Sequence, residues 1–64
     1  MIWHRDREDR TVKVLESDGW YFQMDGELPI ELFPGDILEI PREQWHRVIM
    51  KKKTRLVVEV VVKS

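Results

Sequence analysis

Hydrophobic and polar residues alternate along most of this chain, and no segment has the period of an amphipathic helix. A period of two places successive side chains on opposite faces of a β-strand. The pattern therefore predicts strands over residues 12–16, 20–24, 27–32, 36–40, 45–50 and 55–63. Short strands separated by frequent turn signals are typical of an antiparallel sandwich or barrel.

Runs of glycine, proline and aspartate mark the turns between these strands. Asp25-Gly26 is typical of a two-residue hairpin turn, in which both positions must tolerate positive φ. Pro34-Gly35 predicts the next turn. Pro29 predicts a sheet edge or a bulge, because proline has no amide hydrogen to donate. Residues 1–10 are strongly charged and are expected to form an edge strand or a loose arm.

The last expected strand carries apolar side chains on both faces. One face holds Leu56, Val58, Val60 and Val62, and the other holds Val57, Glu59, Val61 and Lys63. A sheet with one solvated face does not need such a pattern, and an exposed strand of this kind tends to aggregate. We therefore expect a homodimer in which a second copy covers this strand.

Length and composition narrow the class of protein. With 64 residues and no cysteine, the chain is expected to be one domain, residues 1–64, with a small core and no disulfides. A bound metal or a partner subunit can supply the missing stability, and we favour a partner.

Charge and hydropathy exclude several partners. The 11 basic and 12 acidic residues give a net charge of −1, so no overall attraction to nucleic acid or to anionic membranes is expected. No apolar stretch approaches the roughly 20 residues that span a bilayer. The N-terminus lacks the apolar core of a signal peptide, so we expect a cytoplasmic protein, which the absence of cysteine also fits.

One run, residues 34–48, combines a turn, a strand, a second turn and a strand that opens on a histidine. Gly35 is followed by five residues and then Pro41, and His46 lies five positions after Pro41. This order and spacing resemble the second signature motif of the cupin superfamily, the small β-barrels that often hold a metal ion.

The match to that motif is partial. Glu43 stands at the place of its second glycine and Met50 at the place of its final asparagine. The resemblance covers about residues 4–62. It implies an all-β fold, a small antiparallel β-barrel or jelly roll with a pocket between its sheets. We expect dimerisation to complete this barrel.

The first cupin motif is more degenerate. With Ser17 at its glycine, Arg10 stands at the place of the glutamate, Asp6 at the second histidine and His4 at the first. The resemblance thus implies His4, Asp6 and His46 as the ligands of one divalent transition metal. Two histidines and one carboxylate form the facial triad of non-haem Fe(II), and such a set also holds Zn, Mn or Ni.

Arg10 opens an alternative interpretation. A guanidinium repels a divalent cation but binds a carboxylate or phosphate through two hydrogen bonds. On this interpretation the pocket has no metal and holds an anionic ligand, or nothing. His46 alternates with Val48 and Met50, so it is expected to face inward as a ligand or as a hydrogen-bonded core residue. His4 has the alternative of a solvated surface residue.

An aromatic stripe also has two interpretations. Trp20, Phe22 and Met24 share one face of residues 20–24, which indicates core packing or, with Arg10, the wall of a ligand pocket. The chain shows no nucleophilic motif and no phosphate-binding loop.

Three functional hypotheses follow. The chain is a metal-dependent small-molecule enzyme such as a dioxygenase or isomerase, a non-catalytic module for a small anionic or sugar-like ligand, or a structural subunit whose pocket is vestigial. Nothing in the sequence names a substrate, and fold resemblance alone does not assign a reaction.

Overall fold

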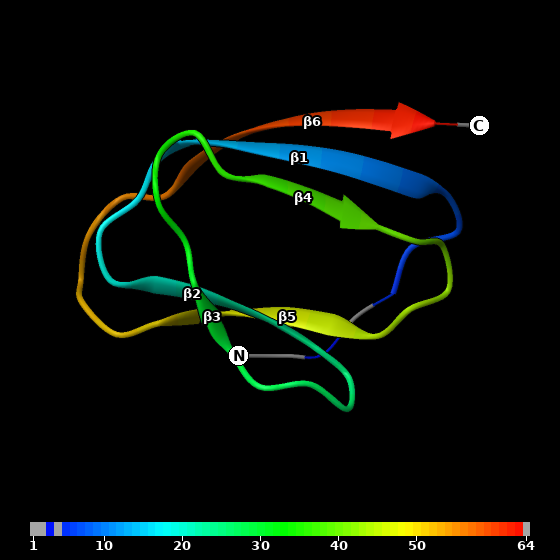
Figure 1. Ribbon diagram of the computed structural model, residues 1–64, viewed down its shortest axis with the longest axis horizontal. Coiled ribbons are helices and arrows are strands. Elements are labelled where there is room, and N and C mark those ends of the chain that lie inside the picture. Colours follow the sequence, from blue (N-terminus) through cyan, green and yellow to red (C-terminus); the bar gives the residue numbers. More distant parts are fainter. Residues whose placement is uncertain (1–2, 4, 64) are drawn as a thin grey trace.

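The computed structural model describes residues 3 and 5–63, and these residues form six β-strands and no helix. The strands are β1 (Asp9–Glu16), β2 (Trp20–Met24), β3 (Ile30–Glu31), β4 (Ile37–Ile40), β5 (His46–Met50) and β6 (Val57–Lys63). They build two antiparallel three-stranded sheets, with orders β4-β1-β6 and β3-β2-β5. Figure 1 shows these sheets as two layers packed face to face. The expectation of an all-β antiparallel fold is confirmed.

β1 is the centre of the first sheet. Thr11 is paired with Glu39 of β4 on one side and with Val61 of β6 on the other. β2 has the same position in the second sheet, where Phe22 is paired with Ile30 of β3 and Val48 of β5. Each central strand therefore has hydrogen-bonded neighbours on both sides, and the other four strands are edges.

The core lies between the two layers. Its buried members come from the inward faces of the central strands and from nearby positions: Val12, Val14, Phe22, Leu32 and Ile40. Trp20 and Met24 pack against this cluster, as the alternation in residues 20–24 predicts.

The two sheets do not join into a closed barrel in the described part of the chain. No ladder links β3 to β4 on one side of the sandwich, or β5 to β6 on the other. Closure requires every strand to pair with two neighbours. β3 has two residues and follows Pro29, so it offers too short an edge for β4. The sandwich therefore has two open sides, which we call the β3/β4 seam and the β5/β6 seam.

Two turns show where local sequence rules hold and where they fail. In the Pro34-Gly35 turn, the Asp36 amide donates to the carbonyl oxygen of Phe33 at 3.0 Å and Gly35 has φ +94°, as a type II turn requires. At Asp25-Gly26 the predicted turn also forms, and the Glu27 amide donates to the carbonyl oxygen of Met24 at 3.1 Å, but only the glycine has positive φ. The prediction that these two residues alone connect the strands is wrong, because Pro29 delays the next strand until Ile30.

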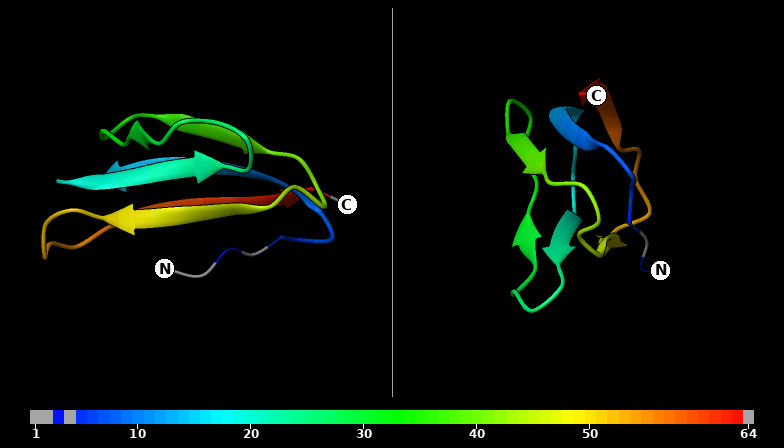
Figure 2. Two further views of the ribbon diagram at one scale, coloured as in Figure 1. Left: turned by 90° about the horizontal axis from the view of Figure 1, so that it is seen from below. Right: turned by 90° about the vertical axis from the view of Figure 1, so that its right-hand side faces the viewer.

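Residues 5–8 lead away from β1 and turn back beside β5, on the side of β5 away from β2 (Figure 2). Residues 9 and 10 belong to β1, so part of the charged N-terminal run is strand. Among the residues that the structure describes, there is no membrane-spanning helix.

Candidate functional site

A cavity of about 170 Å³ lies between the two layers. Its walls are mostly apolar side chains from both sheets: Val12, Phe22, Leu32, Leu38, Ile40, Val48, Leu56, Val58 and Val60. Its polar lining comes from Asp6, Arg10 and His46. An apolar space with a few convergent polar groups is the usual form of a small-molecule site.

His46 is buried at the first position of β5, with 4% of its surface exposed. Its Nδ1 lies 2.9 Å from the carbonyl oxygen of Gln44, and a carbonyl only accepts, so Nδ1 carries the hydrogen. Nε2 faces the Asp6 carboxylate, 3.5 Å from Oδ2, and the two form an ion pair when the imidazole is protonated. The ring also packs against Phe22, with 5.8 Å between centroids.

Asp6 is brought to His46 by the N-terminal segment. The Glu43 amide donates to the carbonyl oxygen of Asp6 at 2.7 Å. Arg5 reinforces this contact, with Nε 3.4 Å from the Glu43 carboxylate and its guanidinium 5.2 Å from the centroid of the Trp45 ring. These contacts fix the segment against the loop that precedes β5, which places the Asp6 side chain in the cavity wall.

Arg10 completes the polar cluster from the inward face of β1. One terminal nitrogen lies 3.5 Å from Oδ1 of Asp6, and 36% of the Arg10 side chain is exposed. Its Nε–H, however, is buried and has no hydrogen-bond acceptor among the described residues. A buried donor without an acceptor is costly, because it has lost its water. This donor is the least satisfied polar group of the cluster.

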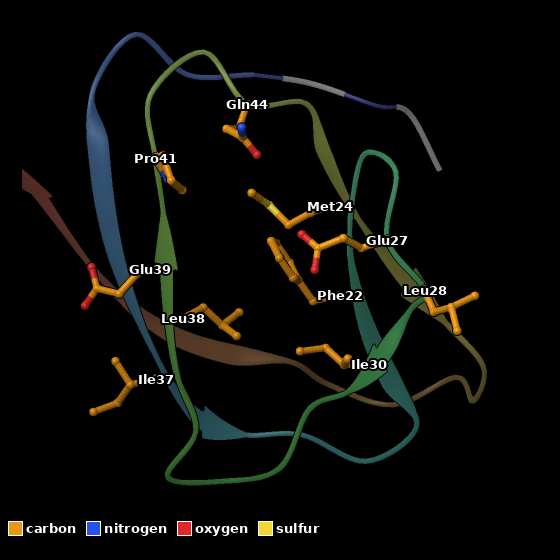
Figure 3. Close-up of a pocket in the computed structure, with 10 residues that line it drawn as sticks. All are labelled: Phe22, Met24, Glu27, Leu28, Ile30, Ile37, Leu38, Glu39, Pro41 and Gln44. Atoms are coloured by element: carbon orange, nitrogen blue, oxygen red, sulfur yellow. The ribbon is translucent and has the colours of Figure 1, made fainter.

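A second, more open space of about 410 Å³ lies at the β3/β4 seam. In Figure 3, Phe22, Met24 and Ile30 reach into it from one sheet, and Leu38 and Pro41 lie across from them. Phe22 and Leu38 also line the inner cavity, so these two side chains stand between the two spaces.

The residues expected to form the site are partly brought together. Asp6, Arg10 and His46 converge on the inner cavity, whereas His4 lies outside the described residues. Phe22 lines both spaces and Met24 lines the outer one.

Trp20 lines neither space, and its Nε1–H donates to Oγ1 of Thr54 at 3.1 Å. Leu38 and Ile30 also form part of the outer space, although the sequence pattern did not indicate them as site residues. Pro29, which shortens β3 and leaves the seam open, was the signal that could have pointed to it.

The donor set for a metal is incomplete in the part of the chain that the structure describes. No group of three His, Cys, Asp or Glu side chains that could hold a metal ion is found there. Asp6 and His46 supply two donors, but the Arg10 guanidinium already lies on the same carboxylate. Because His4 lies outside the described residues, the three-ligand site stays a prediction.

The loop before His46 has one unusual backbone angle. Glu43 has φ +63°, the left-handed region that favours glycine. It is also the position at which the second cupin motif has its second glycine.

No family model matches this chain, and searches of curated proteins and of solved structures find no significant match. The cupin resemblance therefore remains an interpretation of the sequence.

Proposed function

We propose that this chain is a cupin-like binding protein for a small organic anion. The ligand has an apolar body inside the cavity and a carboxylate against Arg10. One observation carries the proposal: the buried Nε–H of Arg10 has no acceptor among the described residues and lies in the wall of an apolar cavity.

A ligand carboxylate would accept hydrogen bonds from the unsatisfied donors of Arg10 in the cavity wall. Arg10 has five N–H donors, and its contact with Asp6 is a loose one of 3.5 Å. A ligand carboxylate can accept from Nε and from a terminal nitrogen together, the two-bond geometry that guanidinium favours.

The rest of the cavity limits the body of the ligand. Most of the lining side chains are aliphatic or aromatic, so they offer no polar partner to an interior hydroxyl group. A volume of about 170 Å³ is also below the few hundred Å³ of drug-sized pockets. Benzoate is therefore a suitable probe, with benzyl alcohol as a neutral analogue of similar shape.

Thermal unfolding tests this proposal. Benzoate is expected to raise Tm beyond sodium chloride of equal ionic strength, because a ligand that binds only the folded state stabilises it, by about 2.7 kcal/mol at 100 times Kd. Benzyl alcohol is expected to raise Tm much less, because it has no carboxylate to accept from Arg10.

Two arginine variants make the result specific. Arg10→Met keeps the length of the side chain and should remove the benzoate response. Arg55→Met is the matched control, because Arg55 pairs with Glu16 on the surface and does not line the cavity. An equal benzoate response in both variants would contradict the proposal.

A second candidate, a metal-dependent small-molecule protein, is favoured by the orientation of His46. Its Nδ1–H donates to a backbone carbonyl, the support that a metal-bound histidine commonly has. Nε2, beside the Asp6 carboxylate, is then the nitrogen that would hold a metal. A bound metal would act as a Lewis acid there. Elemental analysis of the purified protein tests this candidate: about one metal per chain, lost in His46→Ala, supports it. A metal-free protein after reconstitution contradicts it.

A further inference from the structure

β6 is the free edge of the first sheet, and it carries valines on both faces. In the described residues it pairs with β1 alone. Val58, Val60, Val61 and Val62 are between 37% and 51% exposed. We propose that a second copy of this chain pairs with β6 in antiparallel fashion about a two-fold axis. The two β4-β1-β6 sheets then form one continuous sheet.

Symmetry restricts how the two edges can pair. A two-fold axis perpendicular to the sheet keeps the same face of both copies on the same side, so even-numbered positions lie opposite even-numbered positions. The proposed register places Val61 opposite Val61 of the second copy. Val60 then lies opposite Val62 of the second copy on the inward face, which extends the apolar surface across the axis.

The sequence also gives this register a charge match. It places Glu59 directly opposite position 63 of the second copy, where the sequence has a lysine. Within one copy, Glu59 is paired with Lys13 and Asp9 with Lys63. In the combined sheet, one row of residues would cross β1 and β6 of one copy and then β6 and β1 of the second copy. The charges along this row would alternate as Asp9, Lys63, Glu59 and Lys13. Opposite charges directly across a ladder stabilise it, and like charges destabilise it.

Other registers lose this match. A shift of two positions places Glu59 opposite Val61 in one direction, or Val61 opposite Lys63 in the other. The other edge of the sheet, β4, has four residues against seven in β6, so it offers a shorter ladder.

The proposed pairing does not require a ligand, although it uses the side of the sandwich on which the inner cavity meets the β5/β6 seam. Val58 and Val60 line the inner cavity and remain partly exposed at the β5/β6 seam. A copy paired along β6 would bring the two seams next to each other and cover these side chains.

Sedimentation velocity tests the edge that is used. The parent chain is expected to be a dimer, and Val61→Asp should make it a monomer, because two carboxylates would meet at the axis. Ile37→Asp is the matched control, because it places the same charge on β4, at a side chain that is 62% exposed. A monomeric parent, or a dimer that only Ile37→Asp dissociates, would overturn the proposal.

A mixing experiment tests the register without relying on the valines. Glu59→Lys alone and Lys63→Glu alone should each raise the dimer dissociation constant about tenfold, since both symmetric pairs become like-charged. An equimolar mixture of the two variants should form a 1:1 heterodimer, because each position 59 again faces an opposite charge at position 63. Weakened homodimers without heterodimer recovery would overturn this register, and so would two variants that dimerise as well as the parent.

Discussion

β1 and β6 carry the same kind of side chain on the same face, yet they bury it to very different extents. Val12 of β1 is paired with Val60 of β6, and Val14 is paired with Val58. Val12 and Val14 are 8% and 0% exposed, whereas Val60 and Val58 are 45% and 37% exposed. Burial in this protein is therefore set by the neighbours of a strand, and not by the residue type.

The neighbours explain the difference. β1 has strands on both sides, and its inward valines share the core with Phe22. β6 has one hydrogen-bonded neighbour in the described residues and stands beside the open β5/β6 seam. The sandwich thus has more apolar strand surface than one copy covers, and this surplus lies at the cavity wall and at the free edge.

The largest expected effect separates the two strands directly. Val14→Ala should lower the free energy of unfolding by about 2–3 kcal/mol, because it removes fully buried methyl groups and leaves a cavity. Val58→Ala should cost less than about 1 kcal/mol when monomeric protein is measured. Urea unfolding at low protein concentration measures both. Equal losses would show that β6 is as well covered as β1.

A polar replacement of nearly the same shape sharpens the comparison. Val12→Thr should cost about 1–2 kcal/mol, since it buries a hydroxyl in an apolar site. Val60→Thr should stay within about 0.5 kcal/mol, because water reaches that side chain. Thermal unfolding of the two variants compares their losses of stability. A larger loss of stability for Val60→Thr than for Val12→Thr would contradict the assignment of β6 as the exposed strand.

The smallest expected effect concerns what holds the start of β6. Trp20 of β2 donates to Thr54, whose hydroxyl donates to the carbonyl oxygen of Asp18. Trp20→Phe removes the first bond and should cost about 1 kcal/mol. Hydrogen exchange should become faster in the first residues of β6 and stay unchanged in β1. Unchanged exchange in β6 would show that this bond does not anchor the strand.

Local features of the fold could be predicted from the sequence. Residues 20–24 form a strand with the expected bounds and inward face, because alternation and an adjacent glycine turn specify both. Pro34-Gly35 forms its turn because proline and glycine fit the two central positions. Which strands pair, and that both seams stay open, could not be predicted, since pairing is decided by contacts between distant segments.

In the site, too, local features could be predicted from the sequence, and contacts between distant segments could not. The inward position of His46 follows from alternation, and the structure places it at 4% exposure. That Asp6 joins it depends on the path of the N-terminal segment across the loop that precedes β5. That Arg10 of β1 lies in the same cavity wall depends on how the two sheets stack, and no local pattern specifies either. The role of Leu38 between the two spaces likewise depends on how the sheets stack.

Ligand binding at Arg10 can be observed on its unsatisfied Nε–H donor itself. In a ¹⁵N-labelled sample, the Nε–Hε signal of Arg10 is followed by NMR while benzoate is added, with sodium chloride of equal ionic strength as the reference. We expect a saturable shift of the Arg10 signal, together with shifts of cavity residues such as Val12, and no comparable shift for Arg55. An Arg10 signal that moves no more than that of Arg55 would contradict the binding site.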